Sequence, residues 1–287
     1  MKFEQILADI REDRSRGASE LARRCLNHVT QYVADVPASD TVDMIDKMRG
    51  LAAALRRVRP SMVALDNLLD DYERALVPLA ETALQDARSE AKDAAQSLIR
   101  RSRAAVSACA SRMAECVSPG STVFTHSTSS TVREYIRLKA GDNIRCIFTL
   151  GYPLCEGLQF ADFLTEANVP GTLLADAEAA LYIADADCVV VGADTVLFNG
   201  DVVNKSGTCL LALAARDAGI PFYVCCESFK LARTEKPDFH LEEMSPAEIT
   251  DRTWPDITVR NVYFDITPAR LVTGLVTEDG IHDGHNS

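Results

Sequence analysis

The chain has 287 residues, of which 47% are hydrophobic, so most of its length can fold around a buried core instead of staying disordered. The formal net charge is −12. This argues against a general surface for nucleic acids or anionic membranes, because phosphate groups favour clustered lysine and arginine. Nowhere do about twenty apolar residues follow one another, so we expect no membrane-spanning helix.

Nine cysteines occur without a C-x-x-C pair and without the Cys/His spacing of a zinc site. Several lie inside apolar runs, such as Cys188 in DCVVV and Cys225–Cys226 in YVCCES. Buried, reduced thiols are typical of cytosolic proteins, and the first residues, MKFEQILADIRED, lack the apolar core of a signal peptide. We therefore expect a cytoplasmic protein with no metal and no other cofactor.

Residues 1–117 read as a helical N-terminal domain. Between residues 19 and 33, and again between 42 and 55, apolar side chains recur at three- and four-residue steps, which predicts helices with one buried face. These side chains are Leu21, Ala22, Cys25, Leu26, Val29, Val33, Val42, Ile45, Met48, Leu51, Ala52 and Leu55. Residues 76–116 are Ala-rich and charged, with no Gly or Pro after Pro78. That composition predicts one long helix, continuous or broken.

Residues 118–287 read as an α/β domain. Short runs rich in Val, Ile and Phe alternate with helix-like stretches such as Leu158–Glu166. The predicted strands are STVFTH, NIRCIFTL, VPGTLLAD, DCVVVGAD, PFYVCC and NVYFDI. Their spacing predicts a Rossmann-like, doubly wound parallel sheet, with DCVVV as a strand buried on both faces. Residues 231–260 are polar and contain three prolines, so we expect an irregular excursion there.

Polar side chains follow the ends of several predicted strands, where an open α/β sheet gathers its ligands. Asp194 follows DCVVVGA, Lys230 follows PFYVCCESF, and Ser127 ends STVFTHS. Asp194 could be a general acid or base, or it could accept backbone N–H groups in the turn. Ser127 and His126 point to opposite faces of one strand, so they are poorly placed as a nucleophile and its base.

The segment from Asn199 to Thr208 combines a tight turn with a helix start. Asn199-Gly200 predicts a hairpin with a type I′ turn, because Asn and Gly tolerate positive φ angles. Asn204 and Lys205 are predicted to open a helix that continues to Ala218, where free N–H groups and the lysine would form an anion site. The alternative is an ordinary helix cap beside an exposed lysine.

Two arginines in the helical half precede predicted helices. Arg16 lies in RGAS, followed by Gly17 and Ala18, and Arg59 lies in RPS. Arg16 could hold a phosphate in a bidentate manner. An arginine before a helix can equally be a solvated surface group.

These motifs together resemble the family of the alpha, beta and delta subunits of eukaryotic translation initiation factor 2B. The same family includes methylthioribose-1-phosphate isomerase and archaeal ribose-1,5-bisphosphate isomerase. The similarity is most specific in GADTVLFNGDVVNKSGT, IPFYVCCESFK and FDITPARLVTGLVTEDGI, and it extends to RGAS and RPS. It implies an N-terminal helical domain, a Rossmann-like domain, and assembly into homodimers or larger homo-oligomers.

In the isomerases of this family, a cysteine and an aspartate flank a phosphosugar and move a proton between adjacent carbons. The resemblance places Asp194 at the aspartate position and Ser127 at the cysteine position. It implies substrate contacts at Arg16, Gly17, Ala18, Arg59, Asn204, Lys205 and Lys230. The segment TLGYPLCEG departs from the family's Glu-x-Arg-Pro, which removes one phosphate-side arginine and leaves Cys155 nearby as a thiol to test.

Two functions remain open at this point. The chain could be an aldose–ketose isomerase of a ribose 1-phosphate derivative, which would explain why so many polar site residues are present. It could instead be a non-catalytic protein that binds a sugar phosphate or nucleotide, or that assembles as the translation-factor subunits do. Ser127 favours the second function, because an alcohol is far harder to ionise than a thiol. Neither function requires direct contact with nucleic acid.

Overall fold

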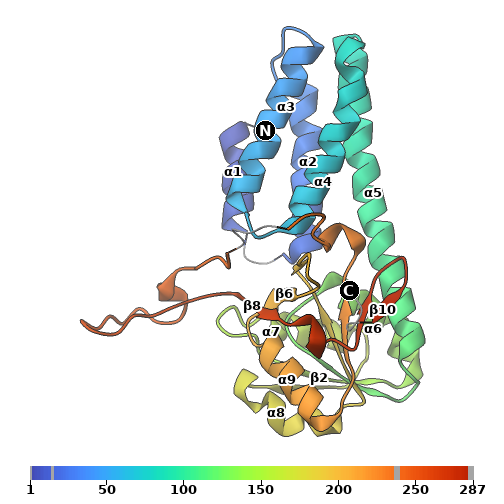
Figure 1. The fold of residues 1–287 in the computed structure, drawn as a ribbon, viewed down its shortest axis with the longest axis vertical. Helices are drawn as coiled ribbons and strands as arrows, with labels where there is room; N and C mark the ends of the chain where they lie inside the picture. The colour runs from blue at the N-terminus through green and yellow to red at the C-terminus, as the bar shows by residue number, and fades with distance from the viewer. Residues whose placement is uncertain (1, 14–15, 236–239, 284–287) are drawn as a thin grey trace. The chain divides into compact units, whose positions relative to one another are not determined.

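The structure is a computed structural model that describes residues 2–13, 16–235 and 240–283 (Figure 1). The chain forms two compact units, Met1–Ala105 and Val106–Ser287. Helix α5 (Leu84–Cys116) runs through this division and ends one residue before the domain boundary predicted at residue 117. Within the described ranges, no helix combines the length and apolar composition needed to cross a bilayer.

The N-terminal unit is helical, as predicted. Its elements are α1 (Phe3–Glu12), α2 (Ala18–Asp35), α3 (Thr41–Val58), α4 (Val63–Leu76), the 3-10 helix η1 (Val77–Glu81) and the first part of α5. The apolar face predicted for α2 is buried, and so is that of α3 from Ile45 onward. Val42 is the exception, because it lies in the first turn of α3 beside an open hollow and is 55% exposed. The long helix predicted from residue 76 is broken by η1, which contains Pro78.

The second unit contains a seven-stranded sheet in the order β10-β9-β7-β4-β1-β2-β3. The strands are β1 (Thr122–Thr125), β2 (Arg145–Thr149), β3 (Gly171–Leu174), β4 (Cys188–Gly192), β7 (Phe222–Cys225), β9 (Gly274–Val276) and β10 (Ile281–Asp283). All neighbouring pairs are parallel except β9 with β10. Every residue of the central strand β4 is buried, as its apolar run predicts.

Helices cover both faces of this sheet, so the unit is doubly wound. On one face, Met113 of α5, Tyr135 of α6 (Ser130–Lys139) and Phe160 of α7 (Gly157–Glu166) form a core with the strands. On the other face, Leu211 of α9 (Thr208–Ala218) and Ile183 of η4 (Ile183–Asp185), which follows α8 (Ala179–Tyr182), form a second core. The expected α/β class with a Rossmann-like parallel sheet is confirmed.

A small antiparallel sheet carries β5 (Thr195–Val196), β6 (Val202–Lys205) and β8 (Phe264–Thr267). Two sequence predictions are wrong for residues of this sheet. The strand predicted in NVYFDI belongs to this sheet and not to the parallel one, because its backbone pairs with β6. Asn204 and Lys205 end β6 and do not open a helix, since α9 begins only at Thr208.

The hairpin predicted at Asn199-Gly200 is present between β5 and β6, but its turn is not type I′. Only Gly200 has a positive φ, of 84°, and its N–H donates to the carbonyl of Leu197. Leu197 in turn donates its N–H to the carbonyl of Asp201. This is the three-residue loop in which a left-handed glycine forms a bulge.

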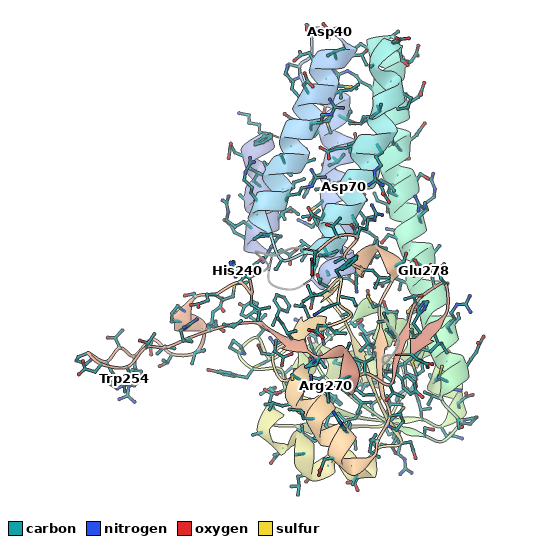
Figure 2. All side chains as sticks on the ribbon, viewed as in Figure 1. Asp40, Asp70, His240, Trp254, Arg270 and Glu278 are labelled. Carbon is teal, nitrogen blue, oxygen red and sulfur yellow. The ribbon has the colours of Figure 1, made fainter. Side chains whose placement is uncertain are left out.

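Residues 240–262 form the expected irregular excursion, which reaches away from the sheet (Figure 1). Short antiparallel bridges join Glu243 to Val262 and Trp254 to Ile257. Trp254 lies near its far end and is 37% exposed, with the Arg252 guanidinium 5.3 Å from its ring (Figure 2). The chain contains one tryptophan, and it lies outside both hydrophobic cores of the sheet.

Candidate functional site

The carboxyl ends of β1, β2, β4 and β7 lie at one edge of the parallel sheet, and most of the predicted site residues follow them. Ser127 follows β1, Asp194 follows β4 and Lys230 follows β7. Asp194 donates its N–H to the carbonyl of Val203, which ties this strand end to β6 and so to Lys205. The start of α6 lies against the end of β4, because a Cβ on Gly192 would lie 2.6 Å from the side chain of Ser129.

Ser127, Glu156 and Lys205 form a connected cluster at this edge. Ser127 has a φ of 64°, a left-handed conformation that is uncommon outside glycine and turns its side chain out of the strand direction. Its hydroxyl donates to Glu156 Oε1 at 2.9 Å, and Lys205 Nζ lies 3.1 Å from the same oxygen. The ammonium also lies 5.1 Å from the centre of the Tyr263 ring. Lys205 is 3% exposed, so it is not the exposed lysine of the alternative interpretation.

Glu156 is the member of this cluster that the sequence analysis missed. It reaches Ser127 because the loop after β2 folds back on itself, with the N–H of Gly157 donating to the carbonyl of Leu150. A Cβ on Gly157 would lie 2.3 Å from the backbone oxygen of Thr149, and a Cβ on Gly151 would lie 3.1 Å from the Glu156 carboxylate. The two glycines of TLGYPLCEG are the sequence signal for this close approach.

Lys230 and Glu227 form a second, buried pair at the end of β7. Lys230 Nζ lies 2.9 Å from Glu227 Oε2, and the hydroxyl of Thr131 donates to Glu227 Oε1. Burial acts to raise the pKa of Glu227, but Lys230 and Thr131 outweigh it and leave that pKa below its ordinary value. Burial acts to lower the pKa of Lys230, but the negative charges of Glu227 and Asp194 outweigh burial. The pKa of Lys230 therefore lies above its ordinary value. Both groups are therefore charged, and the predicted basic contact at Lys230 already has an internal partner.

The helix start predicted as an anion site is occupied by a side chain of the same unit. The carboxylate of Asp265 accepts the N–H groups of Gly207 and Cys209, at 2.8 and 3.1 Å. Asn204 is also engaged, because its Nδ2 donates to the hydroxyl of Thr208 at 3.0 Å. Asp265 therefore already satisfies two N–H groups at the N-terminus of α9, and an anion bound there would have to compete with this carboxylate.

His126 is buried between two oxygens, and this fixes its protonation state. Its Nε2 lies 2.9 Å from the carbonyl of Ser206, which can only accept, so Nε2 carries the proton. Its Nδ1 then accepts the hydroxyl of Thr149. Burial lowers the pKa of His126, so the ring is neutral at pH 7. A neutral ring with both nitrogens engaged does not activate Ser127. This agrees with the expectation that the two residues are poorly placed as a base and its nucleophile.

This histidine makes the stability of the unit depend on pH. Its pKa is lower in the folded chain than the ordinary 6.5, so below pH 6.5 the unfolded chain binds the proton first. We expect His126 to lower the free energy of unfolding by up to about 1.4 kcal/mol for each pH unit below 6.5, until its folded pKa is reached. Urea unfolding of the wild type and of His126→Asn between pH 5 and 8 measures this contribution as the difference. Parallel pH profiles for the two proteins would contradict it.

Four predicted substrate contacts lie in the N-terminal unit. Arg16 pairs with the carboxylate of Asp13, and Arg59 donates to the backbone carbonyls of Ile10 at 3.2 Å and Asp13 at 2.6 Å. Gly17 is the residue before α2, and Ala18 is its first residue. Both arginines therefore contact Asp13, which follows the last residue of α1.

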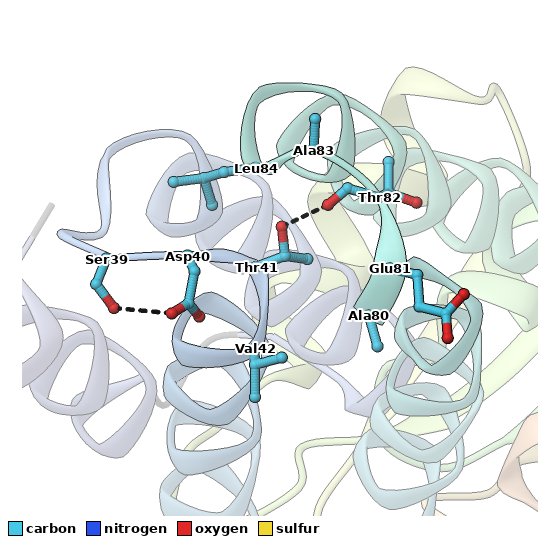
Figure 3. A pocket seen from close by; sticks show the side chains of 9 residues that line it. All are labelled: Ser39, Asp40, Thr41, Val42, Ala80, Glu81, Thr82, Ala83 and Leu84. Carbon is cyan, nitrogen blue, oxygen red and sulfur yellow. Dashed lines mark hydrogen bonds between the residues drawn. The ribbon is translucent and has the colours of Figure 1, made fainter.

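An open hollow of about 350 Å³ lies elsewhere in the N-terminal unit, between the start of α3 and the residues around η1 (Figure 3). Its charged members are Asp40 and Glu81, and the hydroxyl of Thr41 donates to the carbonyl of Thr82 across it. The hollow contains none of the predicted site residues. Its lining offers no basic side chain to an anion, so we do not assign it to a phosphate.

Most of the cysteines are buried in the structure. All nine are free, and six are buried. Burial raises the pKa of Cys146 to about 12 and that of Cys188 to about 12, which keeps both as neutral thiols. Cys155 is partly exposed in the loop after β2, with its Sγ 3.6 Å from the carbonyl of Pro153. In the described residues, no group of three His, Cys, Asp or Glu side chains is arranged to hold a metal ion.

Comparisons with known proteins agree with the resemblance in the motifs. A putative translation initiation factor eIF-2B subunit 2-like protein of Pyrococcus horikoshii is 34% identical over 280 residues, covering 96% of this chain and 95% of that protein. A ribose 1,5-bisphosphate isomerase of Haloferax volcanii is 31% identical over 273 residues, covering 92% and 84%. The crystal structure of a Pyrococcus horikoshii translation initiation factor eIF-2B has a TM-score of 0.84 at 33% identity and covers 97% of this chain and 96% of that one. The model of the initiation factor 2 subunit family matches residues 14–284, and the chain belongs to that family.

Proposed function

We propose that this protein binds a phosphorylated sugar or a nucleotide at the carboxyl edge of its parallel sheet. The observation that carries the proposal is the gathering there of Asp194, Ser127, Lys205 and Lys230, all polar or charged, with two of them almost completely buried. Both lysines are paired within the unit, but burying an ion pair is costly, and such charged groups cluster at functional sites. The Haloferax volcanii relative is named for a phosphosugar substrate, ribose 1,5-bisphosphate.

We further propose that the bound molecule is a ribose 1-phosphate derivative and that the reaction is an aldose–ketose isomerisation. Because O1 carries the phosphate in such a substrate, the bond between C1 and the ring oxygen breaks, one proton moves from C2 to C1, and another moves from the C2 hydroxyl to the released ring oxygen. C2 becomes a carbonyl, and the overall oxidation state does not change. A carboxylate such as Asp194 can carry one of these protons. The hydroxyl of Ser127 can relay a proton to or from the Glu156 oxygen to which it donates.

A non-catalytic role is the second candidate. The hydroxyl of Ser127 stands where the resemblance expects a thiol, and a relative that is 34% identical carries a translation-factor name. In this role the site would bind a sugar phosphate or nucleotide without turnover, within a translation-factor-like assembly. In either role we propose a cytoplasmic homodimer or larger homo-oligomer, which sedimentation of the purified chain tests.

Thermal unfolding with added ligands separates these proposals. We expect ribose 1,5-bisphosphate, methylthioribose 1-phosphate, ribose 5-phosphate or AMP to raise the unfolding midpoint, because a ligand that binds only the folded state stabilises it. If none of the four raises the midpoint, the proposed ligand class is wrong. A ligand that raises it is then tested for incorporation of deuterium from heavy water, which only a turning-over isomerase catalyses.

The variant Asp194→Asn tests the proposed proton carrier. We expect deuterium incorporation to fall by about 10²- to 10⁴-fold, the usual contribution of general acid–base catalysis, while the midpoint shift by ligand remains. Asp201→Asn is a matched control, because it alters another carboxylate, in the hairpin loop, that accepts from Asn199 Nδ2 and from the N–H of Ala269. Unchanged incorporation in Asp194→Asn would remove Asp194 from the mechanism.

A further inference from the structure

The charge of Lys205 is compensated inside its own unit. Its Nζ lies 3.1 Å from Glu156 Oε1, close enough for an ion pair, but the angles do not make a hydrogen bond, and Nζ has no other hydrogen-bond partner in the described residues. Nζ also lies over the Tyr263 ring, 5.1 Å from its centre. The ammonium therefore keeps N–H donors that no protein atom uses, although its charge is already balanced.

The carboxylate of Glu156 has unused hydrogen-bonding capacity as well. Oε1 accepts the hydroxyl of Ser127, whereas Oε2 is buried and has no hydrogen-bond partner in the described residues. A carboxylate can accept about four hydrogen bonds. The side chain is 16% exposed, so it reaches the surface of the site while most of its atoms are covered. A turn about its last bond presents either oxygen to a bound molecule.

A pair that is neutral overall, yet still offers donors and acceptors, suits a neutral polar group. A hydroxyl can donate to the carboxylate and accept from the ammonium at the same time. A phosphate at the same place would approach Glu156 as closely as Lys205, so the repulsion from one would offset the attraction to the other. The arrangement is complementary to the hydroxyl and carbonyl oxygens of a sugar and not to its phosphate.

We propose that Glu156 determines the specificity of this site: by pairing with Lys205, it makes the pair bind a hydroxyl or carbonyl oxygen of a polyol and excludes phosphate from the lysine. This inference rests on the proposed sugar-phosphate function. It differs from the expectation that Lys205 binds an anion, because it assigns the phosphate of the ligand to another part of the protein.

Inorganic phosphate is the first probe, since it needs no knowledge of the natural ligand. In Glu156→Gln, the positive charge of Lys205 holds the amide oxygen toward itself and leaves the NH₂ group facing outward, so the pair becomes a net cation. We expect phosphate to bind this variant about ten-fold more tightly than the wild type at constant ionic strength, measured by calorimetry. The gain should disappear in Glu156→Gln/Lys205→Met. Glu166→Gln, which removes an exposed carboxylate from the end of α7, should bind phosphate as the wild type does.

Sugar hydroxyls are the second probe. We expect the wild type to bind ribose 5-phosphate about ten- to a hundred-fold more tightly than its 2-deoxy or its 3-deoxy analogue, because the lost hydroxyl leaves a charged acceptor unpaired. In Glu156→Gln this ratio should fall toward one. The midpoint of thermal unfolding without ligand confirms that each variant is folded before binding is measured.

The outcomes separate this inference from the function on which it rests. If the sugar phosphates bind but Glu156→Gln keeps the wild-type ratio and gains no phosphate affinity, Glu156 does not set specificity, and the proposed function stands. If the wild type binds phosphate and the single variant Lys205→Met does not, phosphate already reaches the lysine in the wild type, and the inference is wrong. If no sugar phosphate binds the wild type, both the proposed function and this inference fail.

Discussion

Replacing Glu227 by glutamine is expected to lower the free energy of unfolding by about 3–5 kcal/mol. Glu227 is fully buried and Lys230 is 3% exposed, so the substitution leaves a buried ammonium without its partner at 2.9 Å. The hydrogen bond from Thr131 can persist, because glutamine retains an oxygen acceptor. Urea unfolding followed by far-UV circular dichroism measures the loss.

Two further variants show whether the loss comes from the unpaired charge. Glu227→Gln/Lys230→Met should regain most of the stability, because removing both charges costs far less than removing one. Glu243→Gln breaks an exposed ion pair with Arg260, and we expect a change below about 1 kcal/mol. A loss in Glu227→Gln that is no larger than in Glu243→Gln would contradict the assigned role of the buried pair.

The pH dependence of this pair follows from its two shifted pKa values. The pKa of Glu227 lies below its ordinary 4.5, so its contribution to stability is complete above pH 4.5 and declines as the pH falls toward the folded value. The pKa of Lys230 lies above its ordinary 10.5, so its contribution is complete below pH 10.5 and declines above it. The stability difference between the wild type and the double variant should therefore be constant between these limits.

Gly157→Ala is expected to destabilise the C-terminal unit by about 3 kcal/mol, near the upper end of ordinary overpacking costs. The new Cβ would lie 2.3 Å from the oxygen of Thr149 and 2.9 Å from the backbone of Leu150, and neither can move without shifting β2. The loop that carries Glu156 would shift, so the affinity for any bound sugar phosphate should fall together with stability. Unfolding and ligand titration of the same sample measure both effects.

Gly141→Ala is the matched control for this steric argument. A Cβ at Gly141 meets nothing within 4 Å, and its backbone is not left-handed. We therefore expect its stability to equal or slightly exceed that of the wild type, since alanine restricts the unfolded chain more than glycine does. Equal losses in the two alanine variants would show that close contact is not the reason for glycine at position 157.

Much of the fold was predictable from local patterns. The buried run DCVVV predicts a central strand because only a strand covered on both faces can be apolar throughout, and β4 is such a strand. NVYFDI has the same local composition as the parallel strands, yet it pairs with β6 in the antiparallel sheet. Strand composition reports burial, and it does not report which neighbour supplies the hydrogen bonds.

The site was predictable only in part, for a related reason. Ser127 and Asp194 follow strands, so their place at the sheet edge comes from topology alone. Glu156 comes seven residues after the end of β2 and reaches Ser127 only because Gly151 and Gly157 allow the loop to fold back. The capping of α9 by Asp265 joins residues 56 or more positions apart, and no local pattern encodes such a contact.

The position of Trp254 determines what the tryptophan fluorescence of this protein reports. Tryptophan dominates protein fluorescence, and this chain has a single one, near the far end of the excursion and beside Arg252. Its emission therefore reports the surroundings of that loop more directly than the packing of the sheet. The same property makes it a built-in probe for any partner or second copy that covers residues 240–262, because a shift of the emission to shorter wavelengths would signal its removal from water.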